Sequence, residues 1–154
     1  MADLPQRKWL RHEVPETVSG LDPVFFLTVC CQERKHNQLA TDSIWTELLK
    51  TIIHRNESGL WNCTLFLVMP DHVHGIFSFS GKKPMKDVIA DWKRWTATQL
   101  KINWQKGFFD HRLRDEPNAI AKRRYILNNP VRAGLVEHFS DWPYYHDSLP
   151  NLDR

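Results

Sequence analysis

The sequence predicts an α+β fold of the ferredoxin-like, split βαβ type (βαββαβ), followed by one added helix. Three observations indicate this fold. Runs of strand length are rich in apolar and β-branched residues, other stretches repeat apolar residues with helical spacing, and these patterns alternate as β-α-β-β-α-β. At 154 residues, the chain is long enough for one domain with a buried core.

The first part of the pattern is a strand, a helix and a hairpin. Val24–Cys31 is apolar and rich in β-formers, which predicts a buried strand. Thr41–Arg55 carries the apolar stripe of an amphipathic helix. Trp61–Met69 and His72–Ser80 predict two further strands, joined by a tight turn at Pro70-Asp71.

The second part is a helix, a strand and the added helix. Pro84 suits the first position of a helix, and Phe108–Arg114 predicts a short strand. Asp115 is a suitable N-cap for the added helix, which we expect to run through Ala119–Asn129 until Pro130. The domain, residues 1–154, then has a basic N-terminal arm (about 1–22) and an irregular C-terminal tail (about 137–154).

Composition indicates an ordinary globular protein with 42% hydrophobic and 25% charged residues. No apolar run is long enough to span a bilayer, and no basic and apolar leader is visible, so we expect neither membrane insertion nor export. Three cysteines without C-x-x-C spacing suit buried thiols in a reducing compartment, and we therefore expect a cytoplasmic protein.

Positive charge is concentrated between Lys82 and Arg124, where twelve basic residues stand against five acidic ones, although the net charge of the chain is only +3. This segment also contains several Trp and Phe residues. It can hold a phosphate backbone and stack unpaired bases. A solvated helix face whose aromatic residues belong to the core explains the same pattern, and charge alone does not distinguish the two.

The segment His72-Val73-His74 places two imidazoles on the same side of a predicted strand, because side chains alternate between its faces. The pair is half of a metal site, or else two ordinary core or surface histidines. Tyr125 and Asn129 lie four residues apart on one face of the added helix. If that face docks over the histidines, an amide oxygen completes a three-ligand site beside a phenol. Otherwise Tyr125 is a packing residue and Asn129 ends the helix.

These residues resemble those of a known family. Met69-Pro70-Asp71-His72-Val73-His74 resembles the HUH metal motif of single-tyrosine transposases, in which U is hydrophobic. Residues 124–136 are similar to the tyrosine-bearing helix of the REP-associated tyrosine transposases, and Phe109–Asp115 and Asp141-Trp142-Pro143 resemble two further landmarks of that family. Asp71 stands where relatives commonly have Asn, and Asn128 where they commonly have Glu. Asp71 is a candidate outer partner for a histidine.

The resemblance implies a metal-dependent endonuclease and transposase that cleaves and rejoins single-stranded DNA at palindromic hairpins through a 5′-phosphotyrosine. It implies Tyr125 as the nucleophile and His72, His74 and Asn129 as ligands of Mg or Mn. Both a monomer and a homodimer are compatible with the sequence. Lys122 lies one helical turn before Tyr125. Its alternative roles are to stabilise the phenolate of Tyr125, to bind a neighbouring phosphate, or to be an ordinary solvated lysine of the helix. The basic residues that we expect to contact DNA are Arg7, Lys8, Arg11, Lys82, Lys83, Arg94, Arg112, Arg114 and Lys122.

Two other functions fit parts of the sequence. A domesticated, catalytically unused protein that only binds repeat DNA is compatible with every residue above. A nucleotide hydrolase of the histidine-triad kind needs a third histidine at the next alternate position, where this chain has Ile76.

Overall fold

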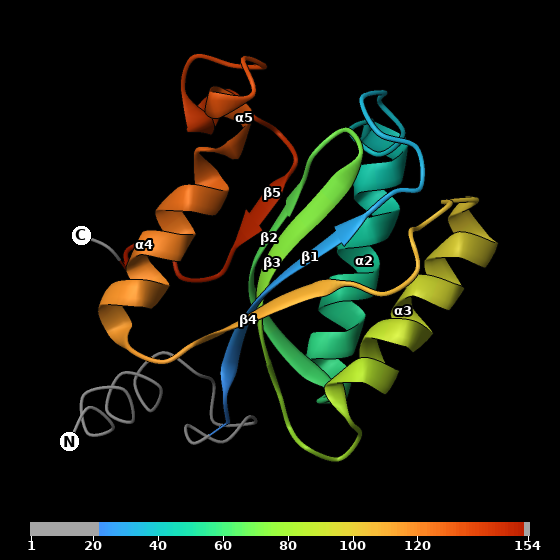
Figure 1. Cartoon of the computed structure of the whole chain (residues 1–154), viewed down its shortest axis with the longest axis vertical. Helices are drawn as coiled ribbons and strands as arrows, with labels where there is room; N and C mark the ends of the chain where they lie inside the picture. The colour runs from blue at the N-terminus through green and yellow to red at the C-terminus, as the bar shows by residue number, and fades with distance from the viewer. Residues whose placement is uncertain (1–21, 153–154) are drawn as a thin grey trace.

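The computed structural model describes residues 22–152, so the predicted N-terminal contacts Arg7, Lys8 and Arg11 lie outside the described residues. One five-stranded antiparallel sheet has the strand order β4-β1-β3-β2-β5 (Figure 1). The strands are β1 (Val24–Cys30), β2 (Trp61–Val68), β3 (His72–Phe79), β4 (Phe109–Leu113) and β5 (Tyr145–Asp147). The helices are α2 (Asp42–Ser58), α3 (Met85–Leu100), α4 (Glu116–Leu127) and α5 (Asn129–Arg132), with a 3₁₀ turn η1 (Phe139–Asp141).

The topology confirms the predicted split βαβ core. Both β1 and β2 pair with β3 in the antiparallel sense, so they run parallel to each other with β3 between them, and β4 adds to the free edge of β1. Helices α2 and α3 cover one face of the sheet, and α4 lies over the other (Figure 1). No helix within residues 22–152 has both the length and the apolar character needed to cross a membrane.

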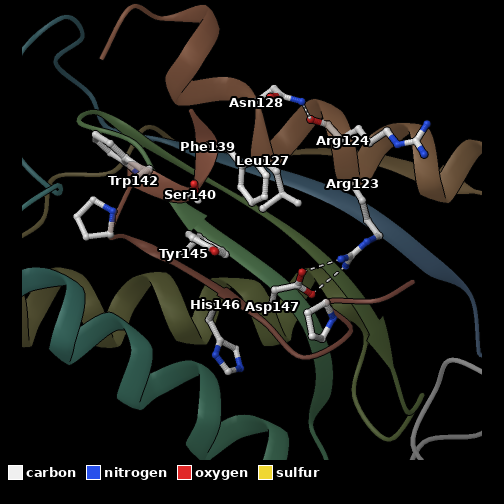
Figure 2. Close-up of a pocket in the computed structure, with 12 residues that line it drawn as sticks. Arg123, Arg124, Leu127, Asn128, Phe139, Ser140, Trp142, Tyr145, His146 and Asp147 are labelled. Carbon is white, nitrogen blue, oxygen red and sulfur yellow. Dashed lines mark hydrogen bonds and ion pairs between the residues drawn. The ribbon is translucent and has the colours of Figure 1, made fainter. Parts of the chain in front are cut away.

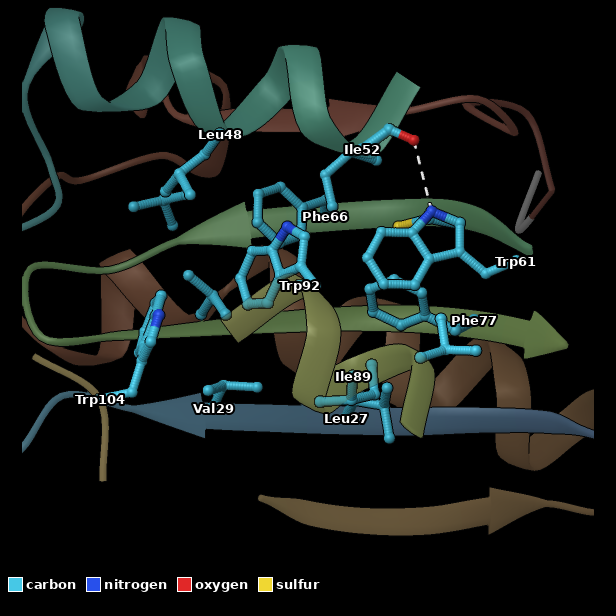
Figure 3. Close-up of a cluster of buried hydrophobic side chains, with 14 of the residues drawn as sticks. Leu27, Val29, Leu48, Ile52, Trp61, Phe66, Phe77, Ile89, Trp92 and Trp104 are labelled. Carbon is cyan, nitrogen blue, oxygen red and sulfur yellow. Dashed lines mark hydrogen bonds between the residues drawn. The ribbon is translucent and has the colours of Figure 1, made fainter. Parts of the chain in front are cut away.

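The larger of two hydrophobic cores lies between the sheet and helices α2 and α3 (Figure 3). Trp61, Trp92 and Trp104 are buried there, and each indole N–H is satisfied. Their acceptors are the carbonyl of Ile52 (3.3 Å), the hydroxyl of Thr51 (2.8 Å) and the hydroxyl of Thr96 (2.9 Å). Trp92 and Trp104 of the basic segment are therefore core residues and are not available to stack on DNA.

The second core lies under α4, on the face of β3 that carries the histidines. Its buried members from the sheet include Phe26, Leu65 and Ile76, and α4 contributes Ile126 and Leu127. Both faces of the sheet are thus covered. Helix α4 packs against the histidine face because this contact buries the apolar side chains of the helix.

Local chemistry explains most of the element boundaries. The hydroxyl of Thr41 accepts from the N–H of Ile44 (3.4 Å) at the start of α2, and Gly59 ends that helix in the left-handed region at φ 78°. The carboxylate of Asp115 accepts from the N–H of Asn118 (2.9 Å), which confirms Asp115 as the N-cap of α4.

Two boundaries differ from the prediction. The tyrosine helix ends at Leu127, and Asn129 begins a separate turn, α5, whose first positions tolerate Pro130 because their N–H groups have no helical acceptor. The tail was expected to be irregular, but its residues Tyr145–Asp147 form β5 on the free edge of β2. Three residues are too few to show a strand period in the sequence, and the open edge supplies the hydrogen bonds.

A buried ion pair attaches this tail to the tyrosine helix. Arg123, only 2% exposed, donates to both carboxylate oxygens of Asp147 (3.1 and 2.7 Å; Figure 2). It also donates to the carbonyl of Leu149 (2.8 Å). One of the basic residues that raised the charge of the 82–124 segment is therefore structural.

Replacing Arg123 by methionine is expected to lower the free energy of unfolding by about 3–5 kcal/mol, because Asp147 keeps its charge but loses its buried partner. Urea unfolding measures this loss. The matched control is the double variant Arg123→Met/Asp147→Leu, which removes both charges and should recover most of the stability. A loss below about 1 kcal/mol in the single variant would show that water replaces the pair without cost.

Candidate active site

The histidine pair lies at the start of β3, directly after the Pro70-Asp71 turn. The N–H of Met69 donates to the carbonyl of His72 (2.8 Å) and closes the hairpin. His72 and His74 then project from the same face of the strand, with ring centroids 4.7 Å apart. The sequence prediction of two imidazoles side by side is confirmed.

Each imidazole is held through its Nδ1 atom. Oδ1 of Asp71 lies 2.7 Å from Nδ1 of His72, and the hydroxyl of Thr28 lies 2.9 Å from Nδ1 of His74. Thr28 is the β1 residue directly opposite His74 in the sheet, so backbone pairing brings this partner into place. Nε2 is thus the ring nitrogen that each histidine can offer to a ligand, an arrangement that fixes the ring orientation of metal-binding histidines.

Asp71 is itself held in place. Its Oδ2 accepts from Nε of Arg34 (2.9 Å) and from the backbone N–H of Lys35 (2.8 Å). Burial raises the pKa of this carboxyl, but the hydrogen bonds from Arg34, Lys35 and His72 outweigh it and hold the pKa well below its usual range. Asp71 is therefore a carboxylate at neutral pH and orients His72, as the sequence suggested.

Both imidazoles are neutral at pH 7. Burial, with the neighbouring His72 and the cations Arg132, Lys122 and Arg34, lowers the pKa of His74 to about 3. Burial also lowers the pKa of His72, although its bond to Asp71 opposes the shift. Neutral imidazoles are the form that binds metals, so no proton has to be removed from either ring first.

Tyr125 reaches this pair from α4. Its ring centroid lies 6.3 Å from that of His74 and 6.3 Å from that of Phe26, which in turn stacks on His74 at 5.3 Å. The Tyr125 side chain is nevertheless 46% exposed, so the phenol stands at the surface beside the buried imidazole.

Two cations flank the tyrosine. The ammonium of Lys122 lies 5.0 Å above the Tyr125 ring and 4.7 Å above the Phe26 ring. The guanidinium of Arg132 lies 4.0 Å from the Tyr125 ring centroid and donates to the Tyr125 carbonyl (2.7 Å). The site around the phenol is therefore positively charged and suited to an anion such as phosphate.

Asn129 lies at the start of α5, four residues beyond Tyr125, and is half-buried. Its backbone carbonyl accepts from the N–H of Ala133 (3.0 Å) and supports that short turn. Its role as a third ligand stays a prediction. Its neighbour Asn128 has a local role, because its side-chain amide donates to the carbonyl of Arg124 (3.0 Å) at the end of α4.

The predicted DNA contacts fall into separate places. Three of them belong to α3 or to the loop before it: Arg94 lies on the helix, and Lys82 and Lys83 precede it. Helix α3 covers the face of the sheet opposite to the face that α4 and Tyr125 cover (Figure 1). Lys83 and Arg94 also both bind the carboxylate of Asp91.

Two further described candidates lie near β4. Arg112 stands opposite Phe25, on the α3 side of the sheet, and Arg114 follows β4; both are exposed. Among the candidates in residues 22–152, Lys122 is the one with a described contact to the tyrosine ring.

Sequence reasoning missed several neighbours of the site. Thr28, Phe26 and Arg34 come from the first strand and the loop after it, and no local pattern distinguishes them from ordinary core or surface residues. Arg132 had a signal, since it lies seven residues, about two helical turns, beyond Tyr125 in the segment that resembles the family's tyrosine helix.

A pocket of about 750 Å³ lies on the other side of α4, between that helix and the C-terminal tail (Figure 2). Its lining includes Arg124, Asn128, Trp142 and Tyr145 but not His72, His74 or Tyr125. The pocket is therefore separate from the histidine and tyrosine site.

Ile76, at the position of a third alternate histidine, is 4% exposed and packed in the second core, which contradicts a histidine-triad hydrolase.

Known proteins of one family resemble this chain. A REP-associated tyrosine transposase of Escherichia coli (strain K12) is 30% identical over 125 residues, covering 78% of this chain and 73% of the relative. A Haemophilus influenzae protein that carries the same family name is 24% identical over 138 residues, covering 79% and 77%. The solved structure of a REP-associated tyrosine transposase bound to a REP hairpin superposes with a TM-score of 0.71 at 25% identity, over 80% of this chain and 76% of that one.

No protein-family model matches the sequence, so the assignment rests on these relatives together with the fold. The relatives, together with the split βαβ sheet, show that the protein is of the tyrosine transposase class. Within that class, the chain belongs to the REP-associated tyrosine transposases.

Proposed function

We propose that the protein is a metal-dependent endonuclease that cleaves and rejoins single-stranded DNA beside palindromic hairpins through a 5′-phosphotyrosine intermediate. The observation that carries this proposal is the position of Tyr125, half-exposed and 6.3 Å from the ring of the neutral His74, between the cations Lys122 and Arg132. A packing tyrosine would not need two cations at its exposed side.

The reaction is a transfer of a phosphoryl group to the phenol. Oη of Tyr125 forms a bond to phosphorus as the bond from phosphorus to the 3′ oxygen breaks, and the proton lost by the phenol is balanced by the proton that the 3′ oxygen gains. A phenol with a pKa of about 10 is a weak nucleophile at neutral pH, so it needs help. Lys122 and Arg132 hold the phosphate near the ring and offset the charge that grows there.

The donor set fits a divalent cation. His72 and His74 would hold the metal through Nε2, with the amide oxygen of Asn129 as the third ligand. Imidazoles alone suit zinc, whereas the amide oxygen and the family resemblance favour Mg or Mn. When bound, the metal neutralises a phosphate oxygen and orients the phosphorus. No group of three or more His, Cys, Asp or Glu side chains in the described part of the chain offers a competing site.

Hairpin DNA is the proposed substrate because the solved relative is bound to a REP hairpin. The decisive experiment incubates the protein with labelled single-stranded repeat DNA and Mg²⁺ or Mn²⁺ and examines a denaturing gel for a covalent adduct. An adduct that requires metal supports the enzyme. Hairpin binding without an adduct in either metal would instead identify a repeat-binding protein whose site is unused.

Two single charge reversals can test which face of the protein contacts DNA. Lys122→Glu should weaken binding of single-stranded substrate and reduce the slope of log affinity against log salt by about 0.7, because Lys122 stands at the tyrosine. Arg94→Glu, with the same change of charge, should have little effect, since Arg94 lies on the opposite layer and already binds Asp91. A salt titration of hairpin affinity measures both. Equal losses would show that the DNA also follows α3, where Lys82 and Lys83 could contact it.

A further inference from the structure

Phe109 is an aromatic side chain in an unusual position. It begins the edge strand β4 and is 61% exposed, the highest value among the large exposed hydrophobic residues of the described chain. In the sheet, Phe109 stands opposite Thr28 of β1, and Thr28 stands opposite His74 of β3. Directly paired residues share a face, so Phe109 lies on the histidine face and not on the face covered by α3.

A continuous row of ring contacts joins Phe109 to the site. Its ring meets that of Phe26 edge to face, with centroids 6.4 Å apart and an interplanar angle of 70°. Phe26 is buried, stacks on His74 and contacts Tyr125, and the ammonium of Lys122 lies 4.7 Å above its ring. Phe26 therefore fixes one edge of Phe109, while most of the Phe109 surface stays open to solvent beside the cationic site.

Other exposed aromatic residues lack this connection. Trp95, 42% exposed, lies on α3 on the opposite layer. Phe139, 41% exposed, lies in η1 and packs against Tyr145 at the pocket behind α4. Of these three, only Phe109 joins the histidine and tyrosine site through described ring contacts.

We propose that Phe109 forms a stacking subsite for a nucleobase of the single strand next to the phosphate that Tyr125 attacks. The inference rests on the proposed function and deepens it. Every base has a π face, so such stacking tolerates any sequence and positions the strand instead of reading it. The exposed His111, which stands opposite Phe26 and so shares this face, borders the same part of the strand.

The test uses single-stranded oligonucleotides with 2-aminopurine placed in turn at each position flanking the cleavage site, because stacking on an aromatic ring quenches its fluorescence. Binding is measured in the Tyr125→Phe background, where no cleavage interferes. At one flanking position, the Phe109→Ala variant should lose the quenching, and its affinity should fall between about fivefold and 150-fold. Phe109→Trp should restore both, whereas Phe109→Leu, apolar but without a ring, should not.

Phe139→Ala is the matched control, since it removes another half-exposed phenylalanine that does not touch the site, and it should leave quenching and affinity unchanged. Unchanged quenching and affinity in the Phe109→Ala variant would overturn the subsite, even if the wild-type protein forms its covalent adduct. The absence of any wild-type adduct would refute the proposed function instead, because the fluorescence assay does not depend on cleavage. Because Phe109 and Phe139 are both exposed, these four variants should fold, and circular dichroism checks this.

Discussion

Replacing Tyr125 by phenylalanine should abolish the covalent adduct with single-stranded repeat DNA while leaving DNA binding nearly unchanged. Only the attacking oxygen is lost, and the ring that packs against Phe26 and His74 stays in place. In enzymes where a covalent nucleophile has been removed, the rate falls by about 10⁶-fold, so no adduct should be visible on a denaturing gel.

The other tyrosines provide matched controls. The phenol of Tyr144 donates to Asp42 (2.9 Å), and Tyr145 lies in β5 against Phe139, on the side of α4 away from the histidines. Tyr144→Phe and Tyr145→Phe should therefore form the adduct at the wild-type level. A normal yield from Tyr125→Phe would place the nucleophile elsewhere and refute the assignment.

His72→Ala and His74→Ala should each eliminate metal-dependent cleavage, because each removes one of the two imidazoles proposed to hold the metal. Asn129→Ala should weaken cleavage without abolishing it, since two imidazoles can still hold a metal when water replaces the third ligand. Asp71→Asn, which keeps a partner for His72 but removes its charge, should raise the required metal concentration by about 10- to 100-fold. Adduct yield against Mn²⁺ concentration measures all four.

His54→Ala is a suitable control, since His54 is an exposed residue of α2 on the opposite layer. It should titrate with Mn²⁺ like the wild type. Retained hairpin binding by the two histidine variants shows that they are folded. A crystal soaked in manganese should show the ion between His72 and His74. If this position stays empty while other sites on the protein bind manganese, the histidines are structural and the metal assignment fails.

Much of the fold was predictable because its signals are local. Alternation along β3 and the Pro70-Asp71 turn were enough to place His72 and His74 on one side of a strand, and the N-cap at Asp115 marked the start of the tyrosine helix. The family resemblance supplied the proposed role of Tyr125 as the nucleophile, which helical spacing alone left open. The short strand β5 and the break after Leu127 were missed, since three or four residues carry no period.

The sequence alone was sufficient for the order of the elements from β1 to α4 and for the position of the histidine pair, because turns, caps and side-chain periods depend on residues close together in the chain. Only the tertiary structure decided which face of the sheet α4 covers, and with it the burial of His74 and the neutrality of both imidazoles. It also separated basic residues of similar appearance: Arg123 holds the tail, Arg94 lies on the far layer, and Lys122 flanks the tyrosine. These differences arise from contacts between distant segments, which depend on packing rather than on local spacing.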